Sequence, residues 1–118
     1  MKLSVIKELL NAEVLSGHDF LDREVTNAYA ADLMSDVLSS LDDKTLLLTG
    51  LTNPHAVRTA EMMDIHSIVF VRGKMPDEET IRMAEENGIV TMKTDNIMFV
   101  TSGILYSEGL RGAVIVRE

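Results

Sequence analysis

The chain has 118 residues, 46% of them hydrophobic, and a formal net charge of −8 at pH 7. This length predicts one domain over residues 1–118 with room for a sizeable core. Because there is no cysteine, disulfides, thiolate zinc sites, iron–sulfur ligation and a thiol nucleophile are all excluded. The acidic charge argues against a nucleic-acid partner, and no apolar run approaches the roughly 20 residues that a membrane span needs. We therefore expect a cytoplasmic protein with neither a nucleic-acid nor a membrane partner.

The N-terminal residues predict a short helix followed by a short strand. Apolar side chains recur at helical spacing from Leu3 to about Asn11, and Ser4 is the candidate cap. Residues Ala12 to Leu15 predict a strand, and Gly17-His18-Asp19 predicts a turn.

The next segment is less regular. The alternation of side chains predicts a strand over Glu24 to Ala30. Asp32 is then a candidate cap for a helix whose apolar stripe is formed by Met34, Val37, Leu38 and Leu41.

The segment from Lys44 to Leu110 contains three successive strand-plus-helix units, around which the rest of the chain is organised. The strands are short apolar runs without alternation, as expected of parallel strands covered on both faces, and comprise Thr45–Thr49, Ser67–Val71 and Ile89–Met92. Each run precedes a helix-start signal: Asn53 before Pro54, then Asp77, then Thr94 or Asp95. The predicted fold class is α/β, a small parallel sheet with right-handed crossovers.

The C-terminal residues Ala113 to Val116 are apolar enough to form a last strand, and equally fit an ordered tail. The predicted third helix, Asn96 to Glu108, is apolar around almost its whole circumference. Such a helix on the surface of a small domain predicts self-association as a homodimer. The alternative is that it lies buried between the sheet and the N-terminal elements.

A ligand site is expected where the strands end, because ligands of open parallel sheets bind outside the carboxyl ends of the strands. Three loops meet there, and they could hold an anionic group through backbone N–H groups, helix dipoles and cationic side chains. The candidate ligand-binding residues are Gly50, Thr52, Asn53, His55, Arg72, Gly73, Lys74 and Thr94. Helix caps and turns use the same residue types, so a purely structural role is the alternative.

No catalytic residue, metal site or cofactor is predicted. The chain lacks a Gly-x-x-x-x-Gly-Lys-Ser/Thr phosphate loop, a Gly-x-Ser-x-Gly elbow and a His-Glu-x-x-His motif. Its histidines, His18, His55 and His66, are scattered.

Three stretches resemble the DRTGG domain family: Tyr29 to Asp36, the helix opening Pro76 to Glu79, and Glu86 to Ile89. The resemblance covers about Leu3 to Leu110, and the architecture is similar to that of the N-terminal domain of HPr kinase/phosphorylase, which lacks the kinase site. It implies an α/β domain, found alone or fused to CBS domains and phosphotransacetylases, with a regulatory or dimerising role and no established reaction.

The sequence departs from the family pattern at the motif that names the family. No contiguous Asp-Arg-Thr-Gly-Gly string is present, and the nearest stretch, Asp22 to Ala28, has Asn27 and Ala28 after its threonine in place of two glycines. If those glycines let a backbone approach a ligand, this chain binds a different ligand or none.

These observations together predict a stand-alone, non-catalytic regulatory module that dimerises. Its expected ligand is a small anion, an adenine nucleotide or a phosphorylated metabolite, at the strand-end loops. One alternative is a structural interaction domain that docks through Asn96 to Glu108. Another is an enzyme acting on a phosphorylated substrate, against which stands the lack of a nucleophile–base pair.

Overall fold

The computed structural model describes residues 1–32 and 41–114. In chain order, the described elements are α1 (Leu3–Leu10), β1 (Glu13–Ser16), a 3-10 helix (His18–Phe20), β2 (Asn27–Ala30), β3 (Thr45–Thr49), α2 (Pro54–Met62), β4 (Ser67–Phe70), α3 (Glu78–Glu86), β5 (Val90–Lys93), α4 (Met98–Ser107) and β6 (Arg111–Gly112). Of the helix predicted after Asp32, residues 33–40 lie outside the described part of the chain.

Within the described residues, six strands form one sheet in the order β1-β5-β4-β3-β2-β6. The three predicted strand-plus-helix units are confirmed, since β3, β4 and β5 are parallel neighbours connected through α2 and α3. Strands β2 and β6 extend the sheet in parallel on one side, whereas β1 pairs with β5 antiparallel at the other edge. The α/β class is therefore confirmed, but the sheet is mixed, with one antiparallel edge strand.

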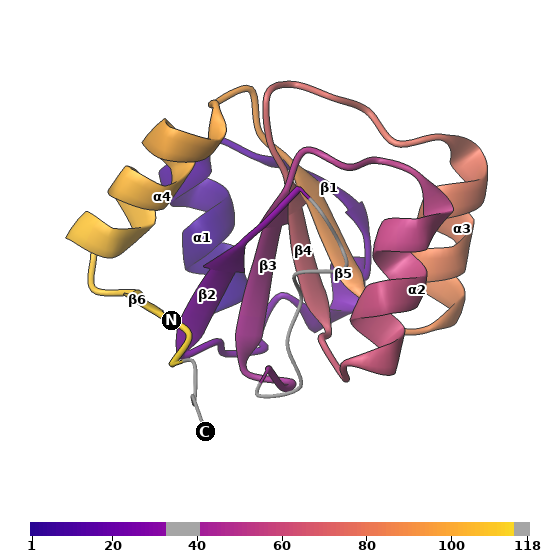
Figure 1. Ribbon diagram of the computed structural model, residues 1–118, viewed down its shortest axis with the longest axis horizontal. Coiled ribbons are helices and arrows are strands. Elements are labelled where there is room, and N and C mark those ends of the chain that lie inside the picture. The colour runs from indigo at the N-terminus through magenta and orange to yellow at the C-terminus, as the bar shows by residue number, and fades with distance from the viewer. Residues whose placement is uncertain (33–40, 115–118) are drawn as a thin grey trace.

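Helices cover both faces of the sheet, with α1 and α4 on one side and α2 and α3 on the other (Figure 1). Successive side chains of a strand point to opposite faces. Leu46 and Leu48 of β3 consequently belong to the core under α1 and α4, and Leu47 belongs to the core under α2 and α3. Burial on both faces explains why these strands are apolar without alternation.

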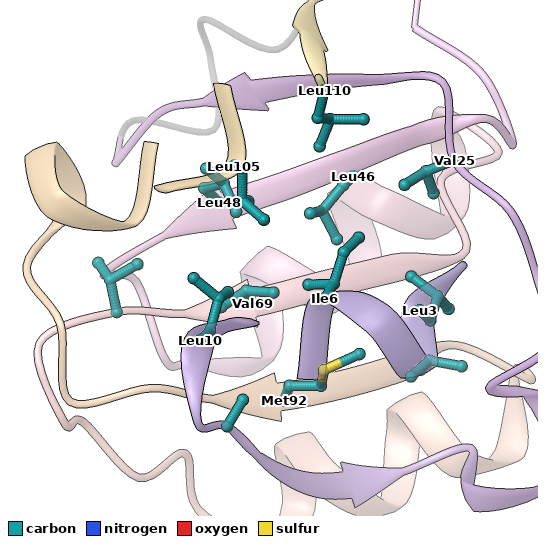
Figure 2. Close-up of a cluster of buried hydrophobic side chains, with 13 residues drawn as sticks. Leu3, Ile6, Leu10, Val25, Leu46, Leu48, Val69, Met92, Leu105 and Leu110 are labelled. Atoms are coloured by element: carbon teal, nitrogen blue, oxygen red, sulfur yellow. The ribbon is translucent and has the colours of Figure 1, made fainter. Parts of the chain in front are cut away.

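The core under α1 and α4 holds the N-terminal helix against the sheet (Figure 2). Leu3, Ile6 and Leu10 are no more than 1% exposed, which confirms the apolar stripe predicted for this helix. Leu105 of α4 lies beside Leu48 of β3 in the same cluster (Figure 2). Each such side chain contributes about 1.5–3 kcal/mol when fully buried, so both helices are anchored mainly by packing.

Two predicted helix caps are confirmed. The Asn53 Oδ1 accepts a hydrogen bond from the His55 backbone N–H at 3.0 Å and opens α2, with Pro54 as its first residue. The Asp77 Oδ1 accepts from both the backbone N–H and the hydroxyl of Thr80, at 2.8 and 2.6 Å, and opens α3.

Two other predicted helix starts are wrong. Helix α1 begins at Leu3 after Lys2, and the Ser4 backbone N–H donates to the carbonyl of Leu21 at 3.0 Å. Helix α4 begins at Met98 after Ile97, which offers no side-chain cap, and so neither Thr94 nor Asp95 opens it.

Strand β2 and the last strand, β6, are shorter than predicted. Glu24 forms only an isolated bridge with Lys2, and β2 starts at Asn27. Strand β6 is Arg111–Gly112, followed by one further bond from the Ala113 N–H to the Ala28 carbonyl at 2.9 Å. The remainder of the predicted last strand, residues 115–116, lies outside the described residues.

Helix α4 is continuous through Gly103 and lies on the surface. Thr101 and Leu105 face the core, while Phe99, Val100 and Tyr106 are 83%, 41% and 61% exposed. The alternative that this helix is buried is therefore wrong for one of its faces. Among the described helices, none is long and apolar enough to cross a membrane.

Candidate functional site

The three loops that follow β3, β4 and β5 meet at the upper edge of the sheet in Figure 1. Parallel strands bring their carboxyl ends to the same edge. The loop after β3 leads into the capped N-terminus of α2, and the loop after β4 carries two cations, Arg72 and Lys74. Two cations and a helix N-terminus thus lie at this edge, beside the carboxylates of Asp32 and Asp95.

Arg72 of the second loop lies against Gly50 of the first. A Cβ atom placed on Gly50 would lie 2.6 Å from the Arg72 Nη2 and 3.1 Å from its Nε, so the guanidinium lies directly against the glycine. The Gly50 backbone N–H donates to the Asp32 Oδ1 at 2.8 Å. Any larger side chain at position 50 would displace the guanidinium, which explains why glycine suits this position.

The backbone that presents Arg72 is itself unusual. Arg72 has a φ of 66° and Gly73 a φ of 68°, so two consecutive residues adopt the left-handed conformation. For a residue with a side chain this conformation costs roughly 1–2 kcal/mol. It is fixed by two hydrogen bonds of 2.8 Å, from the Arg72 N–H to the Asn96 carbonyl and from the Gly73 N–H to the Thr94 carbonyl. The third loop therefore holds the second one in place, and backbone strain of this kind is common at ligand sites.

Arg72 is exposed and has no counter-ion among the described residues, in which each salt bridge involves other side chains. The nearby Asp32 carboxylate accepts a hydrogen bond from the Gly50 N–H. Lys74, two residues along the same loop, is also exposed. The arrangement leaves a positioned guanidinium able to receive an anion in a bidentate manner.

The other predicted site residues divide into those at the edge and one inside the protein. Asn53 uses its side chain to cap α2, His55 is exposed in the first turn of that helix, and Thr52 is half-buried beside it. Thr94 is 1% exposed, and its hydroxyl donates to the Leu10 carbonyl at 2.9 Å. The structure thus brings the first two loops together and turns Thr94 away from them, toward α1.

Asp32 is a member of this constellation that the sequence did not indicate, since it was predicted only as a helix cap. The sequence feature that could have indicated its position is the strand alternation, which puts Ala28, Ala30 and Asp32 on the same face and continues past the end of β2. The Ala31 N–H donates to the Leu48 carbonyl at 3.0 Å, so the pairing of β2 with β3 extends to the residue before Asp32. The strand alternation then places Asp32 opposite Gly50.

The stretch nearest to the family-naming motif lies at the other end of β2. The Arg23 guanidinium donates to the Gly88 carbonyl at 2.5 Å and lies 4.2 Å from the centre of the Phe20 ring, and burial lowers its pKa from the usual value. The Asn27 Oδ1 accepts from the Thr45 hydroxyl at 2.7 Å. Both residues join neighbouring elements, and both are remote from the carboxyl-end loops.

Within residues 1–32 and 41–114, no cluster of three or more His, Asp or Glu side chains is arranged to hold a metal ion. Besides the carboxylates of Asp32 and Asp95, the loop edge provides three positive groups: the Arg72 guanidinium, the Lys74 ammonium and the N-terminus of α2. These groups suit a phosphate or a carboxylate.

Comparison with family models matches the DRTGG domain over residues 5–107. Among solved structures, the chain is similar to the CBS and DRTGG domains of the regulatory region of Clostridium perfringens pyrophosphatase, crystallised with its activator diadenosine tetraphosphate. The TM-score is 0.70 at 14% sequence identity, and the alignment covers 99% of this chain and 51% of that one. This chain thus spans about half the length of that structure, and the likeness concerns the fold. No curated protein matches by sequence. With the family model matching most of its length, the chain belongs to the DRTGG domain family.

Proposed function

We propose that this chain is a non-catalytic regulatory module that binds a small anionic metabolite or nucleotide at the loops Gly50 to Asn53 and Arg72 to Lys74. The observation that carries the proposal is the Arg72 guanidinium, which lies against Gly50 with no carboxylate paired to it among the described residues. An arginine held in a strained backbone conformation, yet left unpaired, is suited to a ligand that arrives from outside.

The neighbouring groups favour a phosphate. The N-terminus of α2 contributes the positive end of its dipole, and Lys74 adds a second cation from the same loop as Arg72. The structural neighbour is described as a regulatory region complexed with diadenosine tetraphosphate, and this supports a nucleotide as the first ligand to test.

The module is also proposed to dimerise through the exposed face of α4. Ile97, Phe99, Val100 and Tyr106 are 54%, 83%, 41% and 61% exposed, and all belong to α4 or its cap residue. Large apolar side chains exposed along one helix in this number are unusual for a small monomer and typical of a protein interface. A structural docking domain would use the same surface but leave the loop edge empty.

Ligand binding is tested by a thermal-shift screen against adenine nucleotides, dinucleotides and phosphorylated metabolites, because a ligand that binds only the folded state raises the midpoint. We expect a concentration-dependent rise that is lost in Arg72→Ala. The matched control is Arg82→Ala, which removes an exposed arginine from α3. A shift that Arg72→Ala leaves intact, or no shift across the panel, would contradict the proposed site and favour the docking domain.

Dimerisation is tested by sedimentation of Val100→Asp, which places a charge within the apolar face of α4. We expect monomers from this variant and dimers from the unmodified chain. The control is Met62→Asp, since Met62 is 79% exposed but lies on α2, on the opposite side of the sheet. Dimers that persist in Val100→Asp would refute the assignment of the interface.

A further inference from the structure

A hollow of about 170 Å³ lies between α4 and the sheet, on the side of β2 and β3. Its floor is formed by Ala28, Ala30 and Leu48, and its opposite wall by Ser102, Leu105 and Tyr106. The hollow exists because β2 places two alanines under the helix where its neighbour β3 places leucines. Leu48 of the floor and Leu105 of the wall, both labelled in Figure 2, also belong to the core under α1 and α4.

The floor of the hollow continues directly into the loop edge. Ala28 pairs with Leu46 and Ala30 with Leu48, and these side chains share the α4-facing side of the sheet. Two residues farther along the same strands come Asp32 and Gly50, which are joined by the 2.8 Å bond from the Gly50 N–H. Alternation places this pair on the same side, about 7 Å beyond Ala30.

Apolar and charged groups thus follow one another along a single row. At one end is an apolar hollow, and at the other are the Asp32 carboxylate and the Arg72 guanidinium, both close to the Gly50 Cα. A ligand that fits this row carries an apolar ring, then hydroxyl groups that can donate to a carboxylate, then an anion for the guanidinium.

We propose that the ligand is a nucleoside phosphate whose base enters the hollow between Ala30 and Ser102, with its sugar near Asp32 and its phosphate on Arg72. This inference rests on the proposed anion site and adds the base-binding half. An apolar cavity of about 150 Å³ accommodates benzene, so this hollow of about 170 Å³ is of the size that receives one six-membered ring of a base. Tyr106 also lines the hollow, together with Arg111, whose guanidinium lies over its ring.

A ligand could also bind the other way round, with its phosphate on Arg111, the cation that lines the hollow. The contacts of Arg111 disfavour this orientation. The Arg111 Nη1 donates to the Tyr106 carbonyl at 3.0 Å, and its guanidinium lies 4.5 Å from the centre of the Tyr106 ring. Arg111 is therefore already engaged, whereas Arg72 is not paired with a carboxylate among the described residues.

The test is calorimetric titration of the full chain with three probes: adenosine 5′-monophosphate, ribose 5-phosphate, which lacks the base, and adenosine, which lacks the phosphate. We expect the monophosphate to bind at least tenfold more tightly than either fragment. Ala30→Leu and Ser102→Leu fill the hollow from its two walls and should reduce monophosphate affinity to that of ribose 5-phosphate. Ser107→Leu, on the same helix but outside the hollow, is the control and should leave monophosphate affinity unchanged.

The outcomes separate this inference from the proposed site. Equal affinity for the monophosphate and ribose 5-phosphate, both lost in Arg72→Ala and unaffected by Ala30→Leu and Ser102→Leu, would overturn the base site and leave the anion site standing. Binding that depends on Ala30 and Ser102 but survives Arg72→Ala would overturn the anion site, and loss in Arg111→Ala alone would reverse the orientation. If none of the three probes binds, both the base site and the anion site are refuted.

Discussion

Replacing Gly50 by alanine should displace the Arg72 guanidinium and weaken ligand binding, while leaving the stability of the fold nearly unchanged. The new Cβ would lie 2.6 Å from the Arg72 Nη2 and 3.1 Å from the Asp32 Oδ1. Both atoms are ends of exposed side chains, which can move without shifting the backbone. Gly50 is not among the residues with positive φ, so alanine can adopt its backbone conformation.

The expected change in the free energy of unfolding is therefore small. Reduced entropy of the unfolded chain contributes about 0.4–1 kcal/mol of stability, and a weakened bond between the Gly50 N–H and Asp32 costs about 0.5–1.5 kcal/mol. The net change should lie within about 1 kcal/mol of zero. Phosphate-ligand affinity should nevertheless fall, because the guanidinium is displaced.

The matched comparison is Gly17→Ala, at a glycine that lies against the backbone and side chain of Val90. Its Cβ would lie 2.8 Å from the Val90 Cγ2 and 2.9 Å from the Val90 Cα, and Gly17 has a φ of 73°. Backbone strain of about 1–2 kcal/mol and overpacking of about 1–3 kcal/mol should together lower stability by about 2–5 kcal/mol. Urea denaturation followed by circular dichroism measures both variants. Equal destabilisation by the two substitutions, or unchanged ligand affinity in Gly50→Ala, would refute the reasoning.

Three further predictions concern stability. Asn53→Ala should lower the free energy of unfolding by about 1 kcal/mol in urea denaturation, because the cap of α2 is lost, while Asn53→Asp should preserve most of it. Leu105→Ala should lower it by about 2–5 kcal/mol, since this side chain is 2% exposed in the core, and a loss below 1 kcal/mol would contradict its role as the anchor of α4. The hydroxyl and then the backbone N–H of Thr80 hold the pKa of Asp77 below its usual value. A lowered pKa gives stability that is present above the unfolded value, near 3.9, and is lost as the pH falls through the folded value. Acidification below about pH 4 should therefore lower the urea midpoint more steeply in the unmodified chain than in Asp77→Asn, and equal slopes would contradict the cap.

The central strands could be predicted because their signal is local. The runs that begin at Thr45, Ser67 and Ile89 are apolar on both sides because helices cover both faces of the sheet. Asn53 and Asp77 are the N-caps of the helices that follow, so these helix starts are also encoded locally. Gly50 and Arg72 could be assigned to one edge of the sheet for the same reason: each immediately follows such a strand.

The strand predicted over Ala12 to Leu15 is present as β1, but its antiparallel pairing at the sheet edge and the orientation of Thr94 could not be predicted, because they depend on distant residues. Strand β1 pairs with β5 across more than 70 residues, and the Ser16 hydroxyl lies 2.6 Å from that of Thr91. Thr94 follows its strand as Arg72 does, yet its hydroxyl is drawn to the carbonyl of Leu10 at the end of α1. Only tertiary packing decides which loop side chains face a ligand.

The position of Asp32 was missed for a related reason. An aspartate before an apolar periodic stretch is a common helix cap, and that local pattern outweighed the strand alternation running through Ala28 and Ala30. The pairing of β2 with β3 places the carboxylate on the Gly50 N–H, whereas the helix that Asp32 is predicted to cap lies at residues 33–40, outside the described part of the chain.

The central claim, that Arg72 and Gly50 form an anion-binding edge, is tested most directly by amide NMR during titration with adenosine 5′-monophosphate. The Gly50 and Gly73 amides report on the two loops that the guanidinium joins. We predict saturable shifts concentrated at these amides in the unmodified chain and their loss in Arg72→Ala. Shifts that leave both amides unmoved, or that persist without Arg72, would contradict the claim.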